Sequence, residues 1–221
     1  MSTIADNIKS IRETISDKCA FVGVADNQPR LIAVSKVQPR ERVVAALDAG
    51  QKIFGENRVQ EASERWADLR EAYPDITLIL IGGLQTNKAA DAVALFDEIQ
   101  SVDRLKLAKT LKKEMIAQGK ELPIYLQVNT GEEAQKGGCM PADLPALLEG
   151  CKDLDLNVVG LMCIPPVGDD PTLHFGLLLK LAARQNLPKL SMGMSSDYDL
   201  AAVMGATDIR VGTGIFGARE T

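Results

Sequence analysis

The sequence contains little that could bind a metal or build a catalytic triad. It has one histidine, His174, and its four cysteines, Cys19, Cys139, Cys151 and Cys163, are widely spaced. No CxxC pair or histidine cluster occurs, so the sequence predicts no metal site. A Ser/Cys-His-Asp hydrolase would need His174, but neither a GxSxG motif nor another nucleophile motif accompanies it. We therefore interpret His174 as structural, and the separated cysteines favour a reduced, cytoplasmic protein.

An excess of basic residues and a long hydrophobic run are also missing. Lys and Arg number 25 against 30 Asp and Glu, and the net charge is -5. No basic stripe is available to a phosphate backbone, so we expect no nucleic-acid partner. Nowhere do about 18 apolar residues follow one another, so we expect no membrane span. Residues 2–18 mix charged residues with isoleucines at helical spacing, which predicts an amphipathic helix and not a signal peptide.

Short apolar runs alternate with amphipathic helical patterns along the whole chain. We predict eight strands, at residues 31–35, 52–54, 77–81, 97–100, 122–128, 156–161, 188–190 and 207–211. Helical patterns lie between them, at 40–49, 57–71, 87–95, 103–117, 141–151, 171–185 and 196–204. Such alternation requires parallel strands with right-handed crossovers, and eight repeats close a barrel. The prediction is an α/β fold, a TIM (β/α)8 barrel with an additional N-terminal helix, in which residues 1–221 form a single domain without a linker.

A doubly wound open sheet is the alternative fold. It is disfavoured because no GxGxxG motif follows the first strand, where that fold places its dinucleotide site. In a barrel, the residues that follow the strands share one rim, and polar side chains gather there in this sequence. They include Lys36, Asn57, Gln85, Asn129, Ser191, Ser195 and Arg210. Amides, hydroxyls, one lysine and one arginine on a single rim predict a site for a polar ligand.

Two loops rich in small residues indicate that the ligand carries phosphate. Residues 191–196 (SMGMSS) and 210–217 (RVGTGIFG) follow the seventh and eighth predicted strands. Barrels of this kind often bind phosphate with these two loops. Small residues let backbone N–H groups approach an anion, and hydroxyls donate further hydrogen bonds. Neither loop is a Walker motif, because GK[ST] is absent.

A phosphate site combined with Lys36 at a strand end suggests a phosphorylated carbonyl compound bound as a Schiff base. Two classes remain open, a sugar-phosphate aldolase and a pyridoxal phosphate protein. Arg210 could lie against a pyridine nitrogen, where its permanent charge would disfavour protonation of that nitrogen. The alternative for Arg210 is a buried salt bridge with Asp208 or Glu56.

Seven segments together resemble the pyridoxal phosphate homeostasis protein family (YggS/PROSC), whose barrel is similar to the N-terminal domain of alanine racemase. The segments are residues 33–36 (AVSK), 54–61 (FGENRVQE), 81–88 (IGGLQTNK), 128–130 (VNT), 160–166 (GLMCIPP), 190–195 (LSMGMS) and 210–219 (RVGTGIFGAR). The resemblance implies that Lys36 forms the internal aldimine with pyridoxal 5′-phosphate (PLP) and that Arg210 faces the pyridine nitrogen. By the same resemblance, the phosphate would be bound by Ser191, Ser195, Gly212 and Thr213, and the ring would be lined by Asn57 and Met192.

The resemblance also implies an intracellular role in buffering PLP and delivering it, with PLP-requiring apo-enzymes as recipients. The chain departs from the family pattern in three places. Leu78 and Ile79 replace an aromatic-histidine pair, and Gln38 replaces a second basic residue after Lys36. The short stretch between the sixth and seventh strands is expected to trim one barrel helix. Lys136 is kept, and it could serve as an alternative amine, as an anion contact or only as a surface lysine.

These features favour a non-catalytic carrier over a racemase. A racemase needs two bases, one on each face of the substrate, and alanine racemases take the second base from an additional β-domain. The chain ends at Thr221, directly after the predicted barrel, and no histidine is expected on the rim. A PLP-dependent amino-acid racemase remains the alternative, and a Schiff-base aldolase is more remote. We expect a monomer or a weak homodimer.

Overall fold

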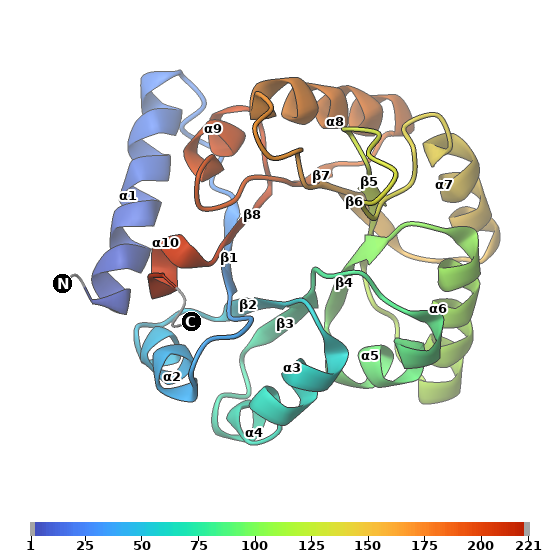
Figure 1. The fold of residues 1–221 in the computed structure, drawn as a ribbon, viewed down its shortest axis with the longest axis horizontal. Helices are drawn as coiled ribbons and strands as arrows, with labels where there is room; N and C mark the ends of the chain where they lie inside the picture. The colour runs from blue at the N-terminus through green and yellow to red at the C-terminus, as the bar shows by residue number, and fades with distance from the viewer. Residues whose placement is uncertain (1–2, 219–221) are drawn as a thin grey trace.

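The computed structural model describes residues 3–218 and shows a closed barrel of eight parallel strands surrounded by helices (Figure 1). The strands follow one another around the barrel in chain order, and β1 pairs with β8 to close it. They are β1 (Arg30–Val34), β2 (Ile53–Glu56), β3 (Thr77–Leu80), β4 (Glu98–Val102), β5 (Ile124–Val128), β6 (Val158–Cys163), β7 (Lys189–Ser191) and β8 (Asp208–Val211). The predicted TIM barrel is confirmed, with every predicted strand found within a few residues.

Helices connect successive strands on the outside of the barrel, and α10 follows the last strand. They are α2 (Arg40–Asp48), α3 (Val59–Trp66), α4 (Leu69–Ala72), η1 (Thr86–Lys88), α5 (Ala89–Leu95), α6 (Leu105–Gln118), α7 (Leu144–Asp153), α8 (Pro171–Gln185), α9 (Tyr198–Val203) and α10 (Thr213–Phe216). The expected trimming of a helix between β6 and β7 is wrong. Helix α8 has 15 residues, because Asp170 caps its first turn and Asn186 ends it in the left-handed conformation. Arg219, the last residue of the segment 210–219, lies outside the described residues.

The additional N-terminal helix, α1 (Ile4–Phe21), lies against the C-terminal part of the barrel (Figure 1). Its first turn is fixed by a capping box between Thr3 and Asp6. Its buried face is a stripe of isoleucines at helical spacing, and the side chain of Asn7 donates a hydrogen bond of 2.8 Å to the backbone oxygen of Ile215. Within residues 3–218, no helix is long and apolar enough to span a membrane.

The interior of the barrel is divided into an apolar and a polar half. Side chains of one strand alternate between the interior and the outer helices. The apolar half is formed by Ile32, Val34, Ile79 and Ile81, which form a cluster separate from the outer core. The polar half contains buried side chains from β4, β5, β7 and β8, namely Glu98, Gln100, Tyr125, Gln127, Ser191, Asp208 and Arg210. Interiors of such barrels are usually filled by branched apolar residues, so the polar half is unusual.

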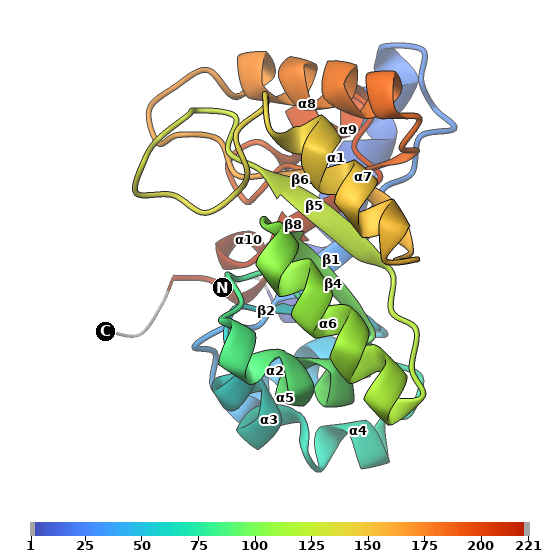
Figure 2. The ribbon, with the colours of Figure 1, turned by 90° about the vertical axis from the view of Figure 1, so that its right-hand side faces the viewer.

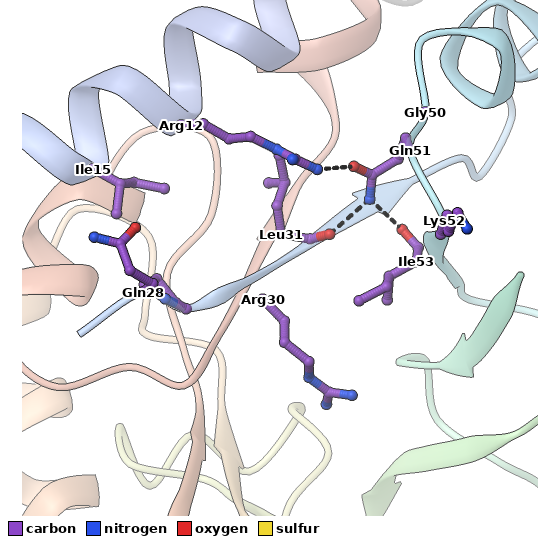
Figure 3. A pocket seen from close by; sticks show the side chains of 10 residues that line it. Arg12, Ile15, Gln28, Arg30, Leu31, Gly50, Gln51, Lys52 and Ile53 are labelled. Carbon is purple, nitrogen blue, oxygen red and sulfur yellow. Dashed lines mark hydrogen bonds between the residues drawn. The ribbon is translucent and has the colours of Figure 1, made fainter. Parts of the chain in front are cut away.

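The end of the barrel where the strands begin, which we call the floor, has a cavity of about 410 Å³ between α1 and the first two strands (Figure 3). Gln51 is buried beside it and donates hydrogen bonds of 2.7 Å to the backbone oxygens of Leu31 and Ile53. Its side-chain oxygen accepts a 3.1 Å hydrogen bond from Arg12 of α1 (Figure 3). This contact ties α1 to the floor, and no residue of the predicted ligand site lies there.

Candidate functional site

A cavity of about 530 Å³ opens at the opposite end, the mouth, where the strands end. This volume lies within the range of roughly 300–1,000 Å³ typical of small-molecule sites. The loops that follow β5 and β6 project beyond the barrel on this side (Figure 2). Six of the eight sequence-predicted site residues line the cavity: Lys36, Asn57, Ser195, Arg210, Gly212 and Thr213.

Lys36 lies in the turn directly after β1, and the residue before it is firmly held. The hydroxyl of Ser35 donates a 2.7 Å hydrogen bond to Oε1 of Glu56, a fully buried carboxylate. The same oxygen accepts hydrogen bonds from Arg65 at 2.7 Å and from Trp66 at 3.0 Å, both on α3. The start of the Lys36 turn is therefore fixed to β2 and α3.

The turn also contains backbone strain immediately after the lysine. Val37 has a φ of 60°, in the left-handed region. A β-branched residue is an outlier there, and such conformations cost of order 1–3 kcal/mol and concentrate at functional sites. The strain lies next to the amine that the sequence singles out.

Arg210 forms part of the cavity lining from the end of β8. Its guanidinium donates a 2.6 Å hydrogen bond to the hydroxyl of Ser191 and a 2.8 Å hydrogen bond to the backbone oxygen of Cys163. Burial lowers the pKa of Arg210 from its usual value, because the guanidinium is removed from water. Both acceptors are neutral, so the cavity contains a buried cation with N–H groups facing a ligand space.

The buried salt bridge considered for Arg210 is not formed with either candidate carboxylate. Asp208 pairs instead with Arg30, whose Nε lies 2.6 Å from its Oδ1, and Glu56 pairs with Arg65. The remaining donor capacity of Arg210 is therefore available to an acceptor in the cavity, such as an aromatic nitrogen.

Backbone N–H groups converge at the β7 and β8 side of the cavity. The N–H groups of Gly212 and Gly214 point at the hydroxyl oxygen of Ser195, at 3.3 and 3.2 Å. A Cβ atom at position 214 would lie 2.8 Å from the side chain of Val211, so only glycine fits there without a shift. Thr213 adds a second hydroxyl between the two glycines. Two amides and two hydroxyls in one loop region suit the oxygens of a phosphate.

The wall of the cavity formed after β2 and β3 depends on a close contact between two backbones. Asn57 follows β2, and a Cβ atom at position 82 would lie 2.1 Å from its backbone oxygen. Gly82 is therefore required for the loop after β3 to approach Asn57. Both residues, together with Gly83, line the cavity.

Ser191 and Met192 do not line the cavity, in contrast to their assignment from the resemblance. Ser191 is fully buried inside the barrel, where its hydroxyl donates to Gln100 and accepts from Arg210. Met192 points to the other side, as strand alternation requires, and is fully buried in the outer core. In the structure Ser191 contacts Arg210 and Met192 packs in the outer core, and their roles toward the phosphate and the ring stay predictions.

Sequence reasoning did not assign several cavity residues. They are Val34, Ile81, Gly82, Gly83, Gln127, Gly137, Ile164, Met194 and Ser196. For Gln127 a signal existed, because it is a polar residue two positions after Tyr125 in an otherwise apolar strand, which places both on the same face. The residues from loops, such as Gly137 and Ile164, carry no comparable pattern.

His174 lies on α8 outside the cavity, and its Nδ1 is 3.1 Å from the hydroxyl of Thr130. Burial raises the pKa of the Cys139 and Cys163 thiols to about 12 and of the Cys151 thiol to about 11, which makes them unreactive. Burial also raises the pKa of Cys19. No group of three or more His, Cys, Asp or Glu residues able to hold a metal occurs within residues 3–218.

The departures from the family pattern also find places in the structure. Ile79 belongs to the apolar half of the barrel interior, whereas Leu78 packs in the outer core. Gln38 is buried outside the cavity lining. Lys136 forms a 2.7 Å ion pair with Glu133 and is not among the cavity residues.

Comparisons with known proteins identify the family. The family model described as "Alanine racemase, N-terminal domain" matches residues 1–220. The pyridoxal phosphate homeostasis protein of Pseudomonas aeruginosa is 41% identical over 226 residues, which cover 100% of this chain and 97% of that protein. This chain belongs to the pyridoxal phosphate homeostasis protein family. Solved structures of PipY from Synechococcus elongatus agree with the assignment. The PipY structure without PLP is 40% identical, with a TM-score of 0.86, and the match covers 97% of this chain and 100% of the PipY chain.

PipY has also been solved with PLP bound, and that chain has 38% sequence identity and a TM-score of 0.82, with 97% of this chain and 100% of that chain covered. The solved structure of an alanine racemase of Clostridium difficile is 10% identical, with a TM-score of 0.75. The match covers 99% of this chain and 57% of the racemase chain. This second likeness shows the shared barrel fold. The mouth cavity of this family member has the groups that PLP requires, because an amine, a buried guanidinium without a carboxylate partner and converging backbone amides surround one space.

Proposed function

We propose that this protein binds pyridoxal 5′-phosphate in the mouth cavity and takes part in intracellular PLP homeostasis as a carrier without enzymatic turnover. The observation that supports it best is the arrangement of Lys36, Arg210 and the loop of Gly212 and Thr213 around one cavity of about 530 Å³. When bound, PLP supplies an aldehyde that reacts reversibly with amines and a ring that withdraws electrons. PLP-requiring apo-enzymes are the proposed recipients.

Each lining group has a role in holding the cofactor. Lys36 would provide the amine that holds the aldehyde carbon, with release of one water molecule. The N–H groups of Gly212 and Gly214, with the hydroxyls of Ser195 and Thr213, would bind the phosphate. Arg210 would donate to the ring nitrogen, and its positive charge would disfavour protonation of that nitrogen.

The same lining supports a carrier over a racemase. Racemisation requires removal of a proton on one face of the substrate and its return on the other, which takes two acid-base groups. Among the described residues that line the cavity, Lys36 provides the amine, and no histidine, tyrosine or carboxylate is present. Arg210 remains protonated at ordinary pH and cannot act as the second base.

The proposal is tested by adding PLP to the apo-protein and recording the absorption band of protein-bound PLP. We expect the band in the unmodified protein and in Lys9→Ala, whose lysine is exposed on α1, and its loss in Lys36→Ala. A band that persists in Lys36→Ala but disappears in Lys136→Ala would move the covalent bond to Lys136. Borohydride trapping of a sugar phosphate without added cofactor would support an aldolase.

The absence of turnover needs a separate assay. The PLP-loaded protein is incubated with amino acids in D₂O, and exchange of the Cα proton is followed by NMR. We expect exchange no faster than with free PLP. Exchange at enzyme-like rates, of about 1 per second or more, would make the protein a racemase or a related enzyme.

A further inference from the structure

The polar half of the barrel interior contains an unbroken chain of hydrogen bonds that ends at Arg210. At one end, the side-chain amide of Gln100 donates a 2.6 Å hydrogen bond to Oε1 of the Glu98 carboxylate. The oxygen of Gln100 accepts a 2.6 Å hydrogen bond from the Ser191 hydroxyl, and the oxygen of that hydroxyl accepts a 2.6 Å hydrogen bond from Arg210. We call this set of four side chains the barrel relay.

The direction of every hydrogen bond in the barrel relay is determined by its two ends. A carboxylate can only accept and a guanidinium can only donate, so Gln100 must give its NH₂ to Glu98 and its oxygen to Ser191. The serine hydroxyl must then donate to Gln100 and accept from Arg210. The dipoles all align between one negative and one positive charge, which strengthens each bond in a buried environment.

Burial isolates the barrel relay from competing water. Gln100 and Ser191 have no exposed surface, and Glu98 and Arg210 are each 3% exposed. Glu98 is in turn held by Arg30, whose Nη2 lies 3.1 and 3.0 Å from its two oxygens, and Arg30 lines the floor cavity. The chain of contacts thus runs from the floor of the barrel to the guanidinium at its mouth.

We infer that Gln100 and Ser191 are positioning residues that orient the Arg210 guanidinium toward the ring nitrogen of the bound cofactor and connect it by hydrogen bonds to the Glu98 carboxylate. The inference rests on the proposed function. A guanidinium has a planar set of donors, so fixing Nη1 on Ser191 and Nη2 on the backbone oxygen of Cys163 fixes its plane. The plane determines which N–H faces the cavity.

The test uses Ser191→Ala and Gln100→Met, each of which removes two hydrogen bonds of the barrel relay with little change in volume. The matched control is Gln51→Met, another buried and hydrogen-bonded glutamine, located at the floor outside the barrel relay. Each protein is loaded with PLP labelled with ¹⁵N in the ring, and the ring-nitrogen chemical shift and the PLP dissociation constant are measured. Circular dichroism and thermal unfolding establish that each variant is folded.

Both barrel-relay variants should move the ring-nitrogen resonance toward that of a pyridine nitrogen without a donor. They should also weaken PLP binding roughly 3- to 10-fold, as expected for one well-formed hydrogen bond. Ser191→Thr, which retains the hydroxyl, should restore the resonance, and Gln51→Met should leave both readouts unchanged. If Ser191→Ala and Gln100→Met fold and bind PLP with an unchanged resonance, the inference is wrong. If the unmodified protein forms no band with PLP, the proposed function itself fails.

Discussion

Arg30→Met removes the cation that holds two buried carboxylates inside the barrel. Asp208 has no exposed surface and Glu98 is 3% exposed, and both accept hydrogen bonds from Arg30. Removing one partner of a buried ion pair costs roughly 3–5 kcal/mol because the other charge is left uncompensated. The Arg30 side chain is 33% exposed, so water screens part of the effect, and we expect the lower end, about 3 kcal/mol. For a domain of this size the loss lowers Tm by roughly 6–12 °C.

Urea unfolding at pH 7, followed by circular dichroism, measures the loss directly. Arg40→Met is the matched control, because Arg40 pairs with Asp68 on the surface, where both side chains are more than half exposed. We expect that control to lose less than about 1 kcal/mol. In the variant that also carries Asp208→Asn and Glu98→Gln, the unpaired charges are gone, so much of the stability should return. A loss below about 1 kcal/mol in Arg30→Met would refute the view that Arg30 compensates these carboxylates.

Three further predictions have defined outcomes. Burial raises the pKa of Glu98 above its unfolded value of 4.5, so its contribution to stability is full below pH 4.5 and is lost as pH rises through the folded pKa. Glu98→Gln should therefore flatten the fall of the unfolding free energy with pH, measured by urea unfolding from pH 4 to 8. An unchanged dependence on pH would contradict this prediction. Val37→Gly should raise the free energy of unfolding by about 1 kcal/mol through relief of the strained φ; a loss of stability would show that the turn is unstrained. Gly160→Ala should lower the free energy of unfolding by about 1–3 kcal/mol, because its Cβ would lie 2.2 Å from the Lys189 backbone oxygen. Gly176→Ala should instead stabilise α8 by about 0.5–1 kcal/mol, because no atom lies closer than 4.0 Å to its Cβ. Thermal unfolding measures both.

The fold was predictable because this sequence separates its strands and helices clearly. Apolar runs such as residues 31–35 and 122–128 alternate with amphipathic segments, and the structure places β1 at Arg30–Val34 and β5 at Ile124–Val128. The helix predicted at 171–185 matches α8, and only its expected trimming was wrong. The short stretch before it, which contains Gly168, Asp169 and Asp170, suggested the trimming, but these residues form a tight turn and a cap that start the helix.

The site was predictable to the level of rim position but not of side-chain direction. Residues just beyond a strand, such as Lys36 and Gly212, fall at the mouth whichever way the strand is rotated. Ser191 and Met192 lie at the end of β7, where a shift by one residue exchanges interior and exterior. Gln100 was missed because its role depends on Ser191 of β7, 91 residues away, which only the folded barrel brings into contact with it.

The contacts between the N-terminal and C-terminal parts of the chain also limit when the molecule can fold. Arg30 and Asp208, which face each other on β1 and β8, are 178 residues apart, and Asn7 and Ile215 are 208 residues apart. At a translation rate of about 5–20 residues per second, the isoleucine face of α1 leaves the ribosome roughly 10–40 s before its partners exist. Until then the isoleucine face of α1 has no partner to bury it, and the barrel cannot close before β8 has been synthesised.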